Sequence, residues 1–211
     1  MPKYPSSYKG VEGSNPVRPL HFNACKLGDV ASFVVEHHYS KSHPGGVDYA
    51  FRADFDDYLC GVALFGWMAG NPKAVHHPAI TVHEQRELMR VVLLDEVPKN
   101  SETQFIGWCL RWLRKNTKLR LIISFADPAH GHTGIIYRAG NWEYVGLQKP
   151  DRPRMIIDGK EVHPKSAYNR YGTSSADVIR WLGHTVELRY REPKHKYLYF
   201  LDKTLAPNTA R

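Results

Sequence analysis

The chain has few cysteines, no long apolar run and no surplus of acidic residues. Its three cysteines, Cys25, Cys60 and Cys109, are odd in number and widely spaced in apolar surroundings, which argues against a disulfide framework or a zinc cluster. No apolar stretch reaches the roughly 20 residues of a membrane-spanning helix, and the amino-terminal MPKYPSSYKG lacks the apolar core of a signal peptide. We therefore expect a cytoplasmic protein with reduced thiols and no membrane partner.

The charge of the chain is positive and unevenly distributed. Its 211 residues include 29 Lys and Arg against 21 Asp and Glu, a formal net charge of +8. Residues 147–211 hold 13 Lys and Arg against 7 Asp and Glu, so +6 of that excess lies there. Tyrosines alternate with these cations, and cations with aromatic rings suit a nucleic-acid surface. A solvated basic tail accounts for the charge equally well.

The pattern of apolar residues predicts a mixed α/β chain behind a loose leader at residues 1–19, which is rich in Pro, Gly and Ser. The expected helices cover residues 25–38, 102–115, 133–139 and 175–182. The expected strands cover residues 48–52, 58–68, 87–94, 119–125, 142–147, 154–157, 185–189 and 197–201. We expect residues 20–211 to form a single domain with a basic part at about residues 147–211.

A polar cluster follows the predicted strand at residues 119–125. Asp127, His130, His132 and Thr133 lie in a loop between that strand and the next predicted helix. Mixed α/β folds commonly build their sites at the carboxyl end of a strand. Packing alone does not explain so many polar side chains in one short loop.

The order of the elements resembles the acyl-CoA N-acetyltransferase (GNAT-like) fold. That fold has a mixed, mostly antiparallel central sheet flanked by helices, and its fourth strand leads through a cofactor-binding turn into a long helix. The turn is normally glycine-rich, so that backbone N–H groups reach the pyrophosphate. Here residues 97–103 read VPKNSET and contain no glycine. An acyl-CoA-type donor is therefore doubtful on this α/β scaffold.

Several separated motifs resemble the Mom family of bacteriophage DNA-modification proteins. They are HYS at residues 38–40, MRVVLLDEVPKNSET at 89–103, SFADPAHGHTGIIYRAGNWEYVG at 124–146 and KHKYLYFL at 194–201. The resemblance implies a GNAT-like fold and the conversion of adenine in double-stranded DNA to N6-(methylcarbamoyl)adenine, which shields phage DNA from host restriction enzymes. The resemblance also implies a need for iron, which has been proposed for the family.

The chemistry of that product differs from acetyl transfer. The adenine N6 amine is a weak nucleophile because its lone pair is delocalised into the ring. Acetyl transfer would join a carbonyl carbon to N6, whereas the family's product joins a methylene carbon that carries a terminal amide. A metal-assisted or redox step, or an unusual alkylating donor, is needed to form that bond.

With this resemblance, the metal candidates are His38, Tyr39 and Asp127. Imidazole, phenolate and carboxylate ligands suit iron better than a thiolate site does. His38 and Tyr39 are adjacent, so both reach one ion only if the helix ends there, as the Pro-Gly-Gly loop at residues 44–46 permits. Alternatively, His38 lies at the surface or caps the helix, Tyr39 is a packed ring, and Asp127 caps the turn before Pro128.

Further residues are expected to line the same cleft. Arg90 is predicted to bind an acidic donor or a phosphate, with a surface ion pair as the alternative. Ser101 is predicted to bind the donor, although a simple N-cap explains it equally well. The predicted catalytic set is Asp127, Tyr39, Ser124, Tyr137 and His130. Of these, Tyr137 is otherwise a core aromatic, and His130 is otherwise a solvent-exposed loop residue.

The predicted DNA-binding residues lie in the basic C-terminal part. They are Lys165, Arg170, Tyr171, Lys194 and Lys196. Because adenine N6 is hard to reach within a duplex, the base is expected to flip into a pocket. Two other functions remain open: a non-catalytic DNA-binding protein, and an acyl-CoA N-acetyltransferase acting on a small amine or peptide. The residues single out neither a donor nor an oligomeric state.

Overall fold

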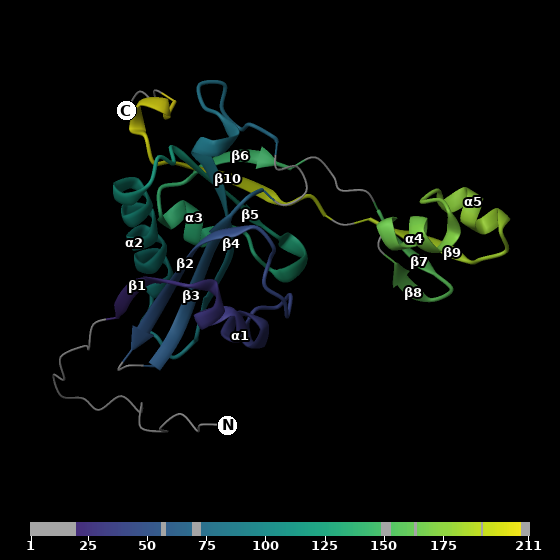
Figure 1. Cartoon of the computed structure of the whole chain (residues 1–211), viewed down its shortest axis with the longest axis horizontal. Helices are drawn as coiled ribbons and strands as arrows, with labels where there is room; N and C mark the ends of the chain where they lie inside the picture. The colour runs from purple at the N-terminus through teal and green to yellow at the C-terminus, as the bar shows by residue number, and fades with distance from the viewer. Residues whose placement is uncertain are drawn as a thin grey trace.

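A seven-stranded sheet with helices on both faces organises most of the chain (Figure 1). The computed structural model describes residues 20–55, 58–68, 73–148, 153–162, 164–190 and 192–207. The predicted leader at residues 1–19 lies outside these ranges. Within them, no helix is long and apolar enough to cross a membrane.

The strand order in the sheet is β1-β2-β3-β4-β5-β10-β6. Of the described neighbours, β4 and β5 run parallel, and the other pairs are antiparallel. This confirms the predicted mixed, mostly antiparallel sheet. The strands are β1 (His21–Cys25), β2 (Val47–Phe55), β3 (Tyr58–Gly66), β4 (Gln85–Leu93), β5 (Leu121–Ala126), β6 (Glu143–Leu147) and β10 (His195–Phe200).

The sheet packs between helices because alternate residues of its strands point to opposite faces. Phe51 and Phe65 face the core under α2 (Ser101–Asn116), while Ala50 and Leu64 face the core under α1 (Leu27–His37). The helix α2 buries the face that its sequence predicts, with Phe105, Ile106, Cys109, Leu110 and Leu113.

The amino-terminal strand β1 is absent from the sequence prediction, which begins a helix at Cys25. In the structure Cys25 ends β1, and α1 starts two residues later at Leu27. Most β1 side chains are exposed, so its sequence, HFNAC, shows no clear alternation of apolar and polar residues. Its pairing with β2 over all five residues fixes it as a strand.

The three cysteines are free thiols, as predicted. Cys60 and Cys109 are buried and Cys25 is half-buried. Burial raises the pKa of the Cys25 and Cys60 thiols to about 11, so neither carries a reactive thiolate at neutral pH.

The parallel strands β4 and β5 separate partway along their length. Their pairing ends at Glu87 opposite Ile123, although β4 continues to Leu93 and β5 to Ala126. Beyond that point β4 stays bonded to β3, and β5 stays bonded to β10. The sheet therefore opens between β4 and β5, and backbone groups that face the opening need other partners.

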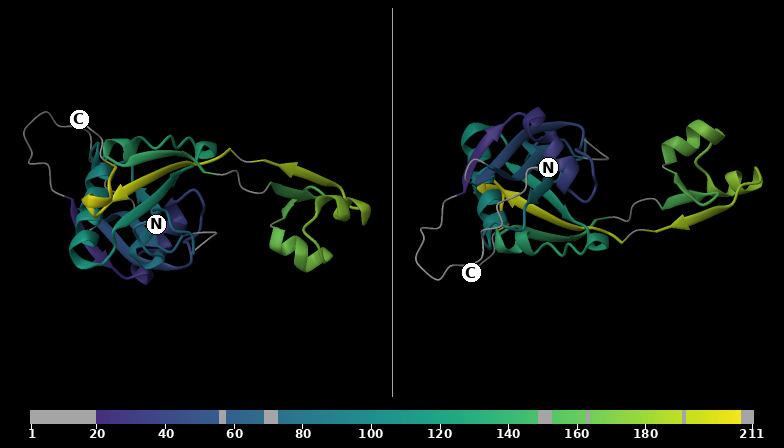
Figure 2. Two further views of the ribbon diagram at one scale, coloured as in Figure 1. Left: turned by 90° about the horizontal axis from the view of Figure 1, so that it is seen from above. Right: turned by 90° about the horizontal axis from the view of Figure 1, so that it is seen from below.

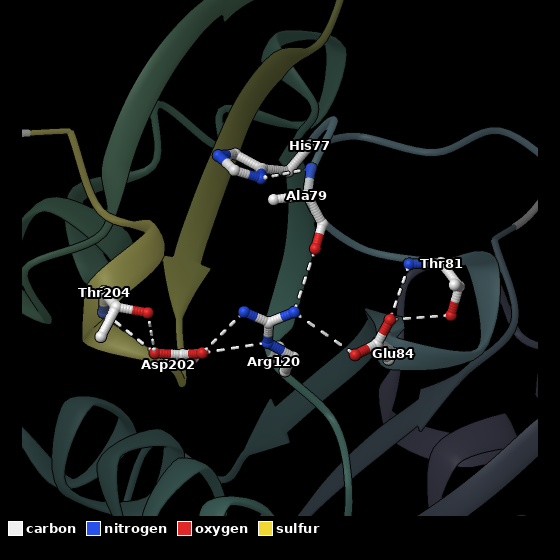
Figure 3. Close-up of polar contacts among 7 residues, drawn as sticks. All are labelled: His77, Ala79, Thr81, Glu84, Arg120, Asp202 and Thr204. Atoms are coloured by element: carbon white, nitrogen blue, oxygen red, sulfur yellow. Dashed lines mark hydrogen bonds and ion pairs between the residues drawn. The ribbon is translucent and has the colours of Figure 1, made fainter.

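At the opposite end of β5, Arg120 ties three parts of the chain together (Figure 3). Its guanidinium donates to Asp202 at 2.9 Å and to the carbonyl of Ala79 at 3.0 Å, and lies 3.5 Å from Glu84. These contacts hold the loop before β4 and the C-terminal turn η3 (Lys203–Leu205) against the start of β5. The amino-terminal ends of β4 and β5 are thus held together, and the strands part only toward their carboxyl ends.

Residues 154–190, here called the inserted lobe, form a second unit between β6 and β10 (Figures 1 and 2). Its sheet has the order β8-β7-β9, and two short helices cover it. The elements are β7 (Arg154–Ile157), β8 (Lys160–Val162), α4 (Pro164–Tyr171), α5 (Ala176–Trp181) and β9 (Val186–Arg189). They enclose their own apolar cluster, formed by Met155, Ile157, Ala167 and Ile179.

The apolar pattern of the chain predicts β7, α5 and β9 as part of one domain of residues 20–211. The pattern predicts neither β8, which has only three residues, nor α4, whose sequence is largely polar. A four-residue apolar core is too small to stand out in a pattern of hydrophobicity. The separate sheet becomes visible only through the pairing of β7 with both β8 and β9.

Candidate functional site

A cavity of about 230 Å³ opens where β4 and β5 separate. Residues 88–91 of β4 and residues 125–127 at the end of β5 form two of its walls. The loop and first turn of α3 (Ile135–Ala139), the end of α1 and the start of α2 complete it. The structure thus gathers most of the predicted site at one place: His38, Tyr39, Arg90, Asp127, His132 and Tyr137 all line the cavity.

The ring of Tyr39 joins the end of α1 to the loop after β5. Its centroid lies 4.1 Å from the His38 ring and 4.1 Å from the His130 ring. The His132 ring lies 5.7 Å away on the same loop. Tyr39 is 46% exposed, so its phenol group is accessible from solvent while its ring is held between two imidazoles.

His38 is buried and sits just after the last residue of α1. The backbone N–H of Ser40 donates to its Nδ1 at 3.1 Å, and the Ser40 hydroxyl lies 2.8 Å from the same nitrogen, so the neutral ring carries its proton on Nε2. Burial, reinforced by the positive charge of Arg90, lowers the pKa of His38 from 6.5 to about 4. The imidazole is therefore neutral at physiological pH, the form that binds metals or accepts protons.

The buried carboxylate of Asp127 has partners for both of its oxygens. Oδ1 accepts from the backbone nitrogen of Ala129 at 3.1 Å, and Oδ2 lies 3.2 Å from the ammonium of Lys194. The first contact caps the turn η2 (Pro128–His130), as one of the two predictions for Asp127 requires. The ion pair was not predicted, because 67 residues separate the two side chains along the chain.

Ser124 and Tyr137 form a buried pair beneath the cavity. The Ser124 hydroxyl lies 3.1 Å from the Leu88 carbonyl, directly past the last β4–β5 pairing, and 2.8 Å from the Tyr137 hydroxyl. Burial raises the pKa of Tyr137 to about 12. This pair replaces the missing backbone bond between the strands, so both side chains hold the opening of the sheet.

Arg90 lines the cavity, and its charged side chain has at least one unused hydrogen-bond donor among the described residues. Its Nη1 donates to the Met89 carbonyl at 2.7 Å. Its Nε is buried and has no hydrogen-bond partner among the described residues. A guanidinium in that state favours an incoming anionic or carbonyl group. The surface ion pair considered from the sequence does not form with any described residue.

Ser101 lies in the first turn of α2 and does not line the cavity. Its hydroxyl donates to the Pro98 carbonyl at 2.6 Å, and Asn100, with φ +70°, holds the N-cap position. The cavity instead meets α2 at Glu102. A carboxylate there is unfavourable for a pyrophosphate, because it adds negative charge where phosphates would bind.

The predicted DNA-binding cations have different environments in the structure. Lys194 pairs with Asp127, and the ammonium of Lys196 lies 2.6 Å from Nδ1 of His76. Each ammonium thus has one partner inside the protein and keeps two further donors. Arg170 is exposed, and the side chain of Lys165 lies outside the described residues. Tyr171 is the fifth predicted residue. It packs on the core of the lobe, and its ring centroid lies 4.8 Å from that of His184.

The described residues contain no group of three or more His, Cys, Asp or Glu arranged for a metal ion. A metal at the cavity would therefore need the Tyr39 phenolate beside His38 and Asp127. The three side chains line one cavity and offer the imidazole, phenolate and carboxylate donors that suit iron.

Replacing Ser124 with Ala should lower the stability of the protein. The change leaves the Leu88 carbonyl and the Tyr137 hydroxyl buried without that partner, at a cost of about 1–3 kcal/mol. We expect the melting temperature to fall by roughly 2–4 °C per kcal/mol, as measured by calorimetry. Ser174→Ala, at an exposed position of the inserted lobe, is the control. Equal melting temperatures for the two variants would contradict this role of Ser124.

The depressed pKa of His38 predicts a loss of stability in acid. Between pH 6.5 and about 4 the unfolded chain binds a proton at this residue that the folded chain excludes. From pH 7 to pH 5, we expect this residue to remove about 2 kcal/mol from the free energy of unfolding. Urea unfolding of chelator-treated wild type and His38→Gln at both pH values measures it. An equally steep pH dependence in both proteins would argue against a buried neutral His38.

Comparison with known proteins identifies the family of this chain. A profile of the Mom protein family matches residues 19–210. The methylcarbamoylase Mom of Escherichia phage Mu is 32% identical over 150 residues, which covers 69% of this chain and 60% of the phage protein. The chain therefore spans less than two thirds of that relative's length.

Solved structures with the same fold are acetyltransferases of low sequence identity. The ribosomal-protein-S18-alanine N-acetyltransferase of Escherichia coli superposes with a TM-score of 0.51 and 7% identity, covering 92% of this chain and 99% of the other. A spermidine N-acetyltransferase chimaera from Vibrio cholerae and hSSAT gives a TM-score of 0.52 and 12% identity, covering 88% of this chain and 98% of the other. These matches show the fold alone. The chain belongs to the Mom protein family and is built on the GNAT fold.

Proposed function

We propose that this protein is a DNA-modifying enzyme that converts adenine in double-stranded DNA to N6-(methylcarbamoyl)adenine. One observation carries the proposal: the opening between β4 and β5 collects His38, Tyr39, Arg90 and Asp127 around a single cavity in a chain of the Mom family. The relative from phage Mu is named a methylcarbamoylase. The modification would protect phage DNA from restriction in the bacterial cytoplasm.

The reaction joins adenine N6 to the methylene carbon of the transferred group. One proton leaves N6, and the bond between that carbon and the rest of the donor breaks. Because N6 is a weak nucleophile, a nearby base must accept the proton as the bond forms. His130 and His132 lie at the exposed edge of the cavity beside Tyr39, where a flipped base would enter.

His38, Tyr39 and Asp127 are the residues that would hold iron. Two features support the fit: the His38 imidazole is neutral, and the Tyr39 side chain is 46% exposed. To bind the metal through Nε2, the ring would have to release the proton that it carries there while Nδ1 accepts from the Ser40 backbone. Bound iron would supply the Lewis-acid or redox chemistry that a bond from N6 to a methylene carbon needs. Lys194 would have to yield part of its contact with Asp127, since both cations compete for the same carboxylate.

Arg90 is the residue that would hold the donor. Its guanidinium lines the cavity, where a carboxylate or amide oxygen of a small donor could accept from it. The Ser124–Tyr137 pair lies beneath this point and keeps the cavity open rather than taking part in bond formation. Ser101 would contribute through the Pro98 turn and not by touching the donor.

Two observations count against the alternative of an acetyl-CoA-dependent acetyltransferase. The turn before α2 contains no glycine, and Glu102 places a carboxylate at the helix end that would face the pyrophosphate. The fold is shared with acetyltransferases, but shared fold does not fix the donor.

The direct test is mass spectrometry of nucleosides from cells that express the protein. We expect a new adenine species in digested DNA from cells with the wild-type protein. DNA without any altered nucleoside, from cells that contain folded protein, would refute the proposed modification.

Removing one candidate ligand should reduce iron content and modification together. We expect Tyr39→Phe, which keeps the stacked ring but removes the phenol oxygen, and Asp127→Asn to lower both at least about tenfold. Elemental analysis of purified protein and nucleoside mass spectrometry measure the two effects. Tyr58→Phe, on the distant hairpin, is the control. Full iron content in the Tyr39 and Asp127 variants would exclude these side chains as ligands.

Replacing Arg90 should separate modification from DNA binding. In Arg90→Met the donor loses a charge-assisted hydrogen bond, so we expect modification to fall roughly 10- to 100-fold. DNA affinity, measured by fluorescence anisotropy, should stay within about twofold of wild type. Arg111→Met, an exposed change on α2, provides the comparison. A parallel loss of DNA affinity in Arg90→Met would place DNA, not the donor, at this side chain.

A further inference from the structure

The inserted lobe carries an unusual amount of exposed apolar surface for its size. Val178, Trp181 and Leu182 are 44%, 84% and 46% exposed. Their spacing of three and four residues places them on one side of α5 and its C-cap residue Leu182, while Ile179 is buried. Tyr168 on α4 and Tyr190 after β9 are 61% and 73% exposed. Side chains of this kind, gathered on one small unit, mark a contact surface.

The charges on the surface of the lobe indicate what kind of partner it binds. Three of its four acidic residues are engaged within the lobe: Asp158 by His184 at 2.7 Å, Asp177 by Arg180 at 2.8 Å and Glu161 by Arg154 at 3.9 Å. Lys160, Arg170 and Arg189 make no ion pair with any described residue, although Arg170 lies over the Tyr171 ring at 5.4 Å. The surface thus offers unpaired positive charge beside exposed aromatic rings, which favours a polyanion with flat apolar groups.

The lobe is attached at the rim of the cavity. The backbone nitrogen of Gln148 donates to the Lys194 carbonyl at 2.8 Å, which closes the two connecting segments at their base. The Lys194 ammonium in turn contacts Asp127 in the cavity wall. Figure 2 shows the lobe projecting from this end of the sheet.

The short connection before β10 also limits the distance between the base of the lobe and Lys194 at the rim of the cavity. Tyr190 is four residues from Lys194, so their Cα atoms lie at most roughly 14 Å apart. With a rise of about 3.4 Å per base pair, that distance spans about four base pairs of duplex DNA. A duplex that runs from the cavity rim toward the lobe would therefore reach the level of Tyr190 within about four base pairs.

We propose that the inserted lobe is a DNA-binding arm: Arg170 and Arg189 contact phosphates, and Trp181 with its neighbours on α5 packs against bases or sugars next to the flipped adenine. This rests on the proposed function, which makes DNA the substrate. Flipping a base leaves an unstacked gap, and apolar side chains inserted at such steps stabilise the distorted duplex.

The lobe residues that carry this role differ in part from those predicted from the sequence. Arg170 keeps its predicted contact with DNA. Of the two tyrosines expected to stack on a displaced base, Tyr168 is exposed and keeps that role, and the exposed Trp181 takes the place of Tyr171, which packs on the lobe core. Lys194 links the base of the arm to the cavity through its ion pair with Asp127.

Fluorescence anisotropy with full-length protein and a labelled duplex tests the proposal. Trp181→Ala should weaken binding about tenfold, the loss expected for one stacked ring. The loss should shrink on a duplex with an unpaired adenine, where less stacking has to be broken. Arg170→Ala with Arg189→Ala should reduce the slope of log affinity against log salt by about two units. Tyr58→Ala and Arg114→Ala with Lys115→Ala, at exposed positions of the main sheet and α2, are the matched controls.

Two outcomes would contradict the proposal that the lobe binds DNA. One is wild-type affinity and salt slope in folded lobe variants. Another is a wild-type dimer that becomes a monomer in Trp181→Ala, as seen by sedimentation, with DNA affinity unchanged. A second copy of the chain would then cover the exposed side of α5. DNA binding that depends on the lobe, in cells whose nucleosides are unaltered, would support the arm and refute only the proposed modification.

Discussion

The separation of β4 from β5 is the constraint on which the site depends. Two parallel strands that part after Glu87 and Ile123 leave backbone groups facing an opening inside the sheet. The Ser124 hydroxyl meets the Leu88 carbonyl at the first position past the pairing, and Tyr137 meets Ser124 from α3. This buried pair satisfies polar groups that would otherwise be costly to bury. The arrangement keeps the strands apart without destabilising the sheet, and the cavity forms in the space between them.

Around that cavity, the polar groups come from four separate stretches of the chain. The end of α1 supplies His38 and Tyr39, β4 supplies Arg90, the loop after β5 supplies Asp127 and two histidines, and the segment before β10 supplies Lys194. Stacking of Tyr39 on His38 and His130 fixes the first and third stretches together. The ion pair of Asp127 with Lys194 connects the cavity to the base of the inserted lobe.

The same scaffold serves acetyltransferases, and the difference lies in the turn before α2. Acetyl-CoA enzymes of this fold present backbone N–H groups to a pyrophosphate. Here Pro98 and Ser101 close the turn on themselves, and Glu102 brings a negative charge to the cavity. The fold supplies the opening between the strands, while the side chains around it decide which chemistry it supports.

Periodicity in the sequence determined the main elements, since α2 and the central strands carry apolar patterns that only one arrangement buries. The quoted motifs were sufficient to place His38, Tyr39 and Asp127 as a candidate set, and the structure brings them to one cavity. Local pattern was insufficient for β1, β8 and α4, which are short or mostly exposed and acquire their form by pairing and packing. The partners of Lys194 and Lys196 were likewise decided only by tertiary structure. A charge in a sequence shows its sign but not its neighbour, because the neighbour is set by contacts between residues far apart in the chain.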